Sequence, residues 1–198
     1  MNRCILFLFL NFSWTGVAVR VPDIYTLSGG YAVTIQGTSN LQNWKDTVGS
    51  VAGMMVVGLN EDAAMDLYSL LIKMKVISIK SSLGTALDNK TYRALKAAAN
   101  PEIIFRIDVP VKIKQVNPGE ECILLKGYLT LAGMSRPVIM QVNTLKLENG
   151  NLQLEGSEAI NMTDYNIKPP SAIFGAIKAR PEIIIYFKTN FSCKQSKV

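Results

Sequence analysis

The fold of this chain is decided by residues 122–148, which read CILLKGYLTLAGMSRPVIMQVNTLKLE. Apolar residues occupy alternate positions in two runs, which is the pattern of half-buried β-strands. Between the runs, the segment AGMSRP (residues 132–137) marks a tight reversal. Because a short link between long strands makes them antiparallel neighbours, this stretch predicts two long paired strands.

The same alternation continues outward in both directions along the chain. The expected strands are residues 23–37, 49–59, 67–81, 102–116, 122–133, 136–148, 152–163 and 182–191, the first of them broken at Gly29-Gly30. The turn signals NPGEE (117–121) and ENGN (148–151) favour hairpins. Residues 84–102 instead place Leu87, Thr91 and Leu95 at helical spacing before Pro101, so we expect one helix there.

Eight strands in an open sheet would leave two long edges, and closing the sheet removes them. The sequence therefore predicts an all-β fold, an eight-stranded antiparallel barrel with one α-helix in a connection. A two-layer sandwich would bury the same residues, and periodicity does not separate the two architectures. The stretch IQGTSNLQNW (35–44) ends its alternation in small polar residues and then presents Trp44, which we interpret as a strand ending at the rim of an apolar cavity.

The N-terminal residues 1–18 have the layout of a secretory signal peptide. Arg3 precedes a short apolar run that ends before the small residues Gly16 and Ala18. A retained hydrophobic anchor is the alternative. Residues 19–198 then form a single domain, a size that suits one core. We expect an exported protein, periplasmic or secreted, without a stable membrane span.

Charged residues point to a solvated outer surface. The chain has 21 Lys and Arg against 15 Asp and Glu. Lys73, Lys75, Lys112 and Lys114 alternate with apolar residues, which favours the wet face of a sheet over a nucleic-acid patch. We therefore expect no nucleic-acid partner. Export would permit a disulfide between Cys122 and Cys193, but nothing in their spacing favours one.

Residues for catalysis are scarce. The chain contains no histidine, which removes the commonest general base and the commonest metal ligand. Glu61, Asp62 and Asp66 could chelate calcium, but they lack the spacing and the glycine of a calcium loop. Asp164 and Tyr165 are interpreted as part of a strand-end turn. We therefore expect neither an enzyme nor a metal site.

The inward face implied by alternation is aliphatic and aromatic, with no charged member. Such a face can hold an apolar ligand by burial, but the pattern alone favours a filled core. The inward residues that would line a tunnel, if the interior is open, are Ile72, Met74, Val76, Ile103, Phe105, Ile107, Leu129, Leu131, Val138, Met140, Val142, Ile185 and Phe187. Leu125 and Ile183 belong to the same inward set.

Four segments occur in the order and spacing of a known family. They read GTSNLQNW (37–44), KTYRALKAAANPEIIF (90–105), KGYLTLAGMSRPV (126–138) and INMTDYNIKPPSAIFG (160–175). On these segments the chain resembles the YceI-like family of bacterial exported proteins, in particular a branch common in Bacteroidetes with a G-T-S-x-x-x-x-W signature. The resemblance covers about residues 25–191.

This resemblance implies a lipocalin-like, extended barrel whose tunnel holds a polyisoprenoid such as a quinone-type lipid, in proteins that are not enzymes. By resemblance, residues 37–44 form the turn out of the first strand. Trp44 then plugs an end of the barrel, the favoured role, or contacts the ligand. The expected function is binding of an isoprenoid-like lipid, quinone or polyprenyl, as a carrier or scavenger without another cofactor. A stress-related structural or interaction barrel with a filled core is the alternative. The oligomeric state stays open, a homodimer included.

Overall fold

The computed structural model describes residues 21–59, 65–107, 110–113, 121–147 and 149–193. The predicted signal peptide and the pair Glu61 and Asp62 lie outside these residues. The strands are β1 (Asp23–Leu27), β2 (Ala32–Ser39), β3 (Asn43–Val48), β4 (Val51–Leu59), β5 (Met65–Lys75), β6 (Ile79–Ser81), β7 (Glu102–Ile107), β8 (Val111–Ile113), β9 (Glu121–Leu131), β10 (Met134–Lys146), β11 (Leu152–Asn161), β12 (Ser171–Ala172) and β13 (Ile177–Cys193). The helices are α1 (Thr85–Ala94) and the short 3₁₀ helices η1 (Val76–Ser78), η2 (Met162–Tyr165) and η3 (Ile173–Gly175).

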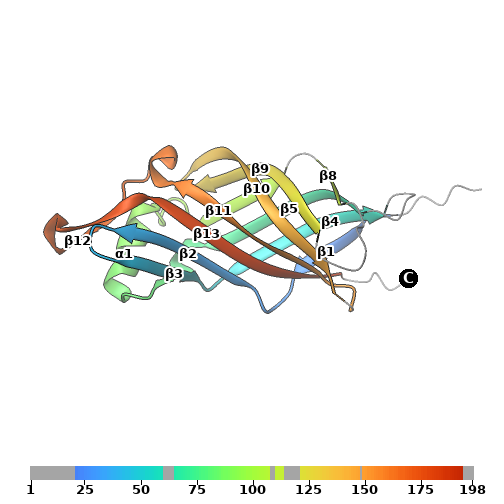
Figure 1. Cartoon of the computed structure of the whole chain (residues 1–198), viewed down its shortest axis with the longest axis horizontal. Helices are drawn as coiled ribbons and strands as arrows, with labels where there is room; N and C mark the ends of the chain where they lie inside the picture. The colour runs from blue at the N-terminus through green and yellow to red at the C-terminus, as the bar shows by residue number, and fades with distance from the viewer. Residues whose placement is uncertain (1–20, 60–64, 108–109, 114–120, 148, 194–198) are drawn as a thin grey trace, which may run out of the picture.

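Hydrogen-bonded neighbours close the sheet into a ring. The order β1-β4-β5-β7-β9-β10-β11-β13 contains eight strands, and β13 also pairs with β1. All of these pairings are antiparallel. The predicted all-β, eight-stranded antiparallel barrel is confirmed, and the sandwich is wrong. Figure 1 shows an elongated barrel with α1 and β12 near one end.

The barrel is long because three of its strands continue past a bend. β1 and β2 both pair with β13, where Leu27 lies opposite Phe191 and Ala32 lies opposite Lys188. Gly30 lies between them with φ of 85°, a conformation that glycine adopts without strain, and the predicted break at Gly29-Gly30 is confirmed. In the same way β3 leads into β4 past residues 49–50, and β5 leads through η1 into β6. The extensions form the α1 end of the barrel.

Several element boundaries differ from the sequence prediction, of which three bear on the ends of the barrel. Residues 37–44 were expected to form a turn and residues 45–48 were assigned to no strand, but residues 43–48 form β3, which pairs with both β2 and β6. The predicted strand 102–116 is divided into β7 and β8, which pair with different parts of β5. Helix α1 ends at Ala94, well before Pro101, because Lys96 adopts φ of 54° and turns the chain.

Alternation along the strands divides the side chains between a core and a wet surface. On β9, Ile123, Leu125 and Leu129 are buried inside the barrel, whereas Leu124 is 58% exposed. Lys75 and Lys112 lie exposed on the outside, as their alternation predicts, while Lys114 lies outside the described residues. One apolar cluster therefore fills the inside of the barrel along its length.

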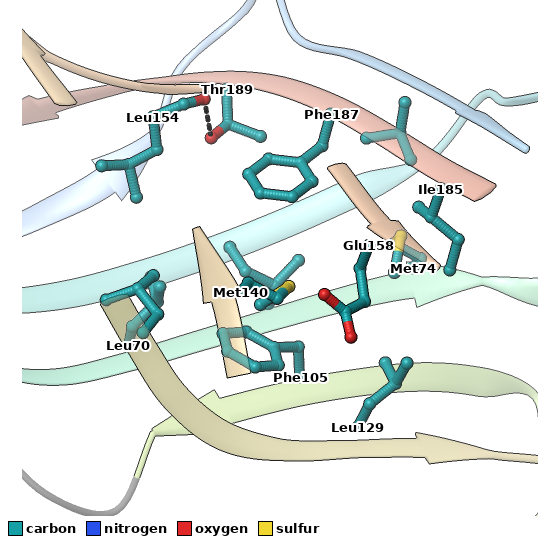
Figure 2. Close-up of a pocket in the computed structure, with 13 residues that line it drawn as sticks. Leu70, Met74, Phe105, Leu129, Met140, Leu154, Glu158, Ile185, Phe187 and Thr189 are labelled. Atoms are coloured by element: carbon teal, nitrogen blue, oxygen red, sulfur yellow. Dashed lines mark hydrogen bonds between the residues drawn. The ribbon is translucent and has the colours of Figure 1, made fainter. Parts of the chain in front are cut away.

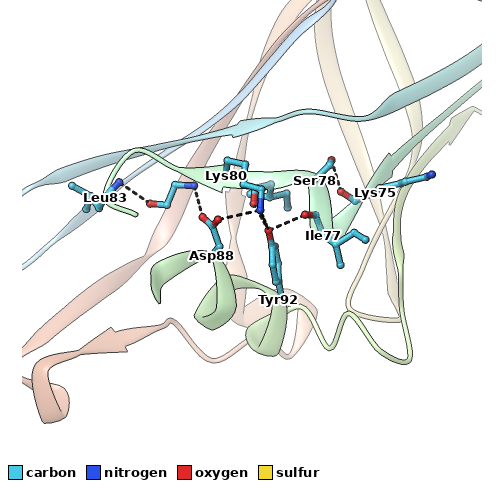
Figure 3. A network of polar contacts seen from close by, with 9 residues as sticks. Lys75, Ile77, Ser78, Lys80, Leu83, Asp88 and Tyr92 are labelled. Atoms are coloured by element: carbon cyan, nitrogen blue, oxygen red, sulfur yellow. Dashed lines mark hydrogen bonds and ion pairs between the residues drawn. The ribbon is translucent and has the colours of Figure 1, made fainter. Parts of the chain in front are cut away.

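Helix α1 docks on the barrel through polar contacts (Figure 3). The Asp88 carboxylate accepts the backbone N–H of Ser81 at 2.7 Å and pairs with Lys80 at 3.2 Å. The hydroxyl of Tyr92 accepts from Lys80 Nζ and lies 2.8 Å from the carbonyl oxygen of Ile79. The hydrogen bond from Ser81, followed by that from Lys80, holds the pKa of Asp88 below its usual value.

The expectations about a disulfide, a metal site and a membrane span can be compared with the described residues. Cys122 and Cys193 are free thiols on β9 and β13. Within the described residues, no group of three or more potential ligands gathers to hold a metal ion. No helix in the described part of the chain has the length and apolar character needed to cross a membrane.

Candidate functional site

A narrow apolar cavity lies inside the barrel (Figure 2). Its volume is about 70 Å³. The lining side chains come from β2, β5, β7, β9, β10, β11 and β13. They are Val33, Leu70, Ile72, Met74, Phe105, Leu125, Leu129, Met140, Leu154, Glu158, Ile185, Phe187 and Thr189. Apart from Glu158 and Thr189 these side chains are apolar, so the cavity offers burial and few polar contacts.

Aromatic rings lying over inward-facing glycines shape the interior. A β-carbon at Gly127 would lie 2.9 Å from the Phe105 ring, and one at Gly156 would lie 2.9 Å from the Phe187 ring. A glycine on a strand thus makes room for a ring from the next strand, a combination that also compensates for the weak strand preference of glycine. Both rings can lie along the cavity because the glycines that they cover, Gly127 and Gly156, have no side chain.

Glu158 places a carboxylate in this apolar cavity. Its inward position follows from strand alternation, since β11 also turns Leu152, Leu154 and Ile160 into the core. In Figure 2 the carboxylate points toward the middle of the cavity, among Met140, Phe105 and Leu129. Burial raises the pKa of Glu158 above its usual value, because an apolar surrounding disfavours the charged form.

The barrel wall is looser beside Glu158. The ladder between β10 and β11 runs from Lys146–Leu152 to Val142–Gly156 and ends there. Beyond that point β10 continues along β9, and β11 continues along β13. A groove of about 510 Å³ lies on the outside between the two diverging strands. It is lined by Arg136, Pro137, Val138, Ile139, Glu158, Ala159, Ile160, Asn161, Asp164 and Tyr165.

Helix η2 lies at the end of this groove. Arg136 Nε donates a hydrogen bond to the carbonyl oxygen of Asp164 at 3.0 Å, which ties β10 to η2. Tyr165 is buried, and Asn166 reverses the chain with φ of 54°. The predicted strand-end turn at Asp164 and Tyr165 is therefore a 3₁₀ helix that closes one side of the groove.

A second cavity, of about 530 Å³, lies between α1 and the strands at the α1 end of the barrel. Trp44 lines it and packs over Gly37, opposite it on β2. The indole Nε1 donates to the carbonyl oxygen of Thr38 at 3.2 Å. Trp44 therefore lies at the α1 end of the barrel and outside the lining of the narrow cavity. Asp46 lines the second cavity too, and burial raises its pKa.

The sequence matches the model of a known protein family. Residues 26–191 match the model of the YceI-like domain. The chain belongs to the YceI-like family. The more detailed assignment to a Bacteroidetes branch stays a prediction. No curated protein matches the sequence significantly.

Solved structures share the fold of this YceI-like domain at low sequence identity. A polyisoprenoid binding domain from Saccharophagus degradans, implicated in plant cell wall breakdown, has a TM-score of 0.65 at 8% identity, covering 87% of this chain and 99% of that one. BcnA from Burkholderia cenocepacia has a TM-score of 0.57 at 16% identity, covering 81% and 95%. The YCEI protein of Campylobacter jejuni has a TM-score of 0.55 at 16% identity, covering 97% and 100%.

Seven of the residues predicted to line a tunnel lie around the narrow cavity of this YceI-like domain. They are Ile72, Met74, Phe105, Leu129, Met140, Ile185 and Phe187. The other six, Val76, Ile103, Ile107, Leu131, Val138 and Val142, are buried in the core without lining it. Val138 also borders the outer groove. Contact of any of these residues with a ligand stays a prediction.

Sequence reasoning missed six lining residues in this YceI-like domain. They are Val33, Leu70, Leu125, Leu154, Glu158 and Thr189, of which Leu125 had been assigned an inward face only. The expectation that no charge falls inside is wrong, because Glu158 lies there. The signal was present, since Glu158 is an even number of residues from Leu152 and Leu154. Its charge obscured that signal, because charged residues usually face solvent.

The carboxylate of Glu158 should make folding stability depend on pH. Below the pKa that Glu158 has in the unfolded chain, its carboxyl group is protonated in both the folded and the unfolded state and does not lower the free energy of unfolding. As pH rises from there through the higher folded pKa, the cost of ionising it inside the barrel develops and then remains. Glu158→Gln should therefore raise the thermal midpoint at pH 7 and leave it near the wild-type value at pH 3.

The control for this measurement is Glu155→Gln. Glu155 lies on the same strand but on the outer face, where it pairs with Lys188 at 3.1 Å. Exposed ion pairs contribute about 0–1 kcal/mol, so this change should leave the midpoint nearly unchanged at pH 7. Circular dichroism melts at the two pH values measure both variants. An equal gain for Glu158→Gln at both pH values would contradict the assignment.

Proposed function

We propose that this chain is an exported lipid-binding protein that holds an isoprenoid-like apolar ligand, a quinone or polyprenyl lipid, inside its barrel, as a carrier or scavenger. The observation that carries the proposal is the almost wholly apolar lining of a cavity enclosed by the barrel. Burial in such a lining contributes roughly 25 cal/mol per Å² of apolar surface removed from water. A structural neighbour named as a polyisoprenoid binding domain supports the ligand class. The layout of residues 1–18 supports export to the periplasm or beyond.

The size of the cavity determines how such a ligand would enter. About 70 Å³ is far below the roughly 300–1,000 Å³ of sites for small organic ligands. A chain-like ligand therefore needs wall side chains to rotate as it enters. Met74 and Met140 suit this, because unbranched thioether side chains adopt many shapes at small cost. The proposed site is therefore a narrow cavity that widens when its wall side chains rotate, and not a permanently open pore.

The same small volume favours a second candidate, a barrel with a filled core that binds a partner protein through its loops. In that case no lipid would accompany the protein, and the residues around Trp44 and Pro170 at the α1 end would form the contact surface. Replacing the loops at that end would then abolish recovery of the partner. Neither candidate involves catalysis.

The lipid proposal is tested by blocking the cavity. Leu129 lines the cavity, whereas the neighbouring Tyr128 is on the outer face and 39% exposed. Leu129→Trp should reduce uptake of geranylgeraniol at least ten-fold, because the larger side chain occupies the space that the tail needs. Tyr128→Trp should leave uptake unchanged. Circular dichroism verifies that both variants are folded.

A second measurement uses the protein as produced in its native host. Organic-solvent extraction followed by mass spectrometry should recover an isoprenoid-like lipid from the wild type and little from Leu129→Trp. Empty extracts, together with no uptake of quinone analogues or geranylgeraniol by the purified wild type, would contradict the lipid proposal. That outcome, with a partner recovered through the α1-end loops, supports the filled-core candidate.

A further inference from the structure

Glu158 is the polar group of the inner cavity that has no partner. Within the described residues, its carboxylate makes no hydrogen bond and no ion pair. The other polar lining residue, Thr189, already donates its hydroxyl to the carbonyl oxygen of Leu154 at 3.2 Å. No side chain or backbone group of the described residues therefore uses the acceptor capacity of the Glu158 carboxylate.

Two cations on the flanking strands contact other groups than Glu158. Arg136 on β10 donates to the Asp164 carbonyl oxygen, and Lys188 on β13 pairs with Glu155 on the outer face. Glu158 is half-buried, and placing even part of a carboxylate against apolar side chains without a protein partner costs some stability that an apolar side chain would avoid. Packing alone therefore does not account for a glutamate at this position.

The position of Glu158 in the barrel wall indicates which part of a ligand it would contact. Among the described residues that line the inner cavity and the outer groove, Glu158 is the one common to both. It lies just past Gly156, where the ladder between β10 and β11 ends. A molecule reaching from the groove into the cavity would pass this carboxylate where the apolar lining begins.

We infer that Glu158 binds the head of the ligand: it accepts a hydrogen bond from the hydroxyl of a lipid alcohol whose apolar tail occupies the cavity. This inference rests on the proposed function and specifies its ligand class. An ionised carboxylate offers acceptors only, so it binds a donating head and gains nothing from an ether. It repels an anionic head such as a phosphate, and the apolar surrounding strengthens that repulsion.

Three probes with one tail and different heads separate these effects. Geranylgeraniol donates a hydrogen bond, its methyl ether does not, and geranylgeranyl monophosphate is anionic. In filter-binding with tritiated probes at pH 7, the wild type should bind the alcohol about ten-fold tighter than the ether, the size of one hydrogen bond to a charged group. The monophosphate should bind weaker than the alcohol.

Glu158→Leu should abolish the preference of alcohol over ether and strengthen binding of the monophosphate. The variant should fold, since it replaces an unpaired carboxylate in an apolar cavity with an apolar side chain. Glu155→Gln, on the outer face of the same strand, should keep the wild-type order of the three probes. A loss of preference in Glu158→Leu but not in Glu155→Gln supports the inference.

Two kinds of failure are distinguishable. If all three probes bind and Glu158→Leu keeps the wild-type order, or if the wild type binds the monophosphate tightest, the inference is wrong and lipid binding stands. If no probe binds to the wild type or to Glu158→Leu, the proposed function fails and the inference fails with it.

Discussion

Met55→Arg should strongly destabilise the barrel, while Met54→Arg should be tolerated. These neighbouring methionines lie on β4 with opposite orientations, since Met55 is 1% exposed and Met54 is 45% exposed. Arginine at position 55 would bury a charge among apolar side chains, at a cost of several kcal/mol. A domain has a total stability of about 5–15 kcal/mol, so this one change removes a large part of it.

Urea unfolding of the two variants measures this difference. Met54→Arg should lie within about 0.5 kcal/mol of the wild type, as is usual for a surface change. The pair is closely matched, because both changes convert the same residue type on the same strand. Equal stability of the two variants would mean that the inner and outer faces of β4 are wrongly assigned.

Gly127→Ala should be the second strongly destabilising change, at about 1–3 kcal/mol. A β-carbon at position 127 would lie 2.3 Å from the carbonyl oxygen of Arg106 and 2.9 Å from the Phe105 ring. The backbone oxygen cannot move without disturbing the pairing of β7 with β9, where Arg106 lies opposite Tyr128. One methyl group therefore disturbs both the ladder and the wall of the cavity.

Gly29→Ala provides the control for this prediction. Gly29 lies in the bend between β1 and β2 and has no atom within 4 Å of an added β-carbon. Thermal melts should show a lowered midpoint for Gly127→Ala and an unchanged one for Gly29→Ala. A wild-type midpoint for Gly127→Ala would show that β7 and β9 can separate at this position without cost.

Alternation predicted the inward faces well because it depends on local geometry. Met140 and Phe187 face inward as their spacing in 136–148 and 182–191 requires, since side chains of a strand alternate between its two sides. The ends of elements were harder to predict. β3 was missed because its strand identity comes from pairing with β2 and β6, and α1 was predicted too long because Lys96 turns the chain early.

The candidate site was only partly predictable for the same reason. Seven predicted lining residues surround the cavity, but Val142 and Ile103, equally apolar and inward, lie in solid core. Whether an inward side chain borders a space depends on the side chains opposite it. Those neighbours come from other strands, so the spacing within one strand carries no information about them.

The sequence alone determined the eight strands, the antiparallel pairing of those joined by short links, and the largely apolar character of the interior, because a strand's two faces follow from its own residues. Only the tertiary structure decided where a cavity remains, where the ladder between β10 and β11 ends, and that the carboxylate of Glu158 lies among apolar side chains. These features depend on how the strands of the closed barrel meet, and they arise between residues far apart in the chain.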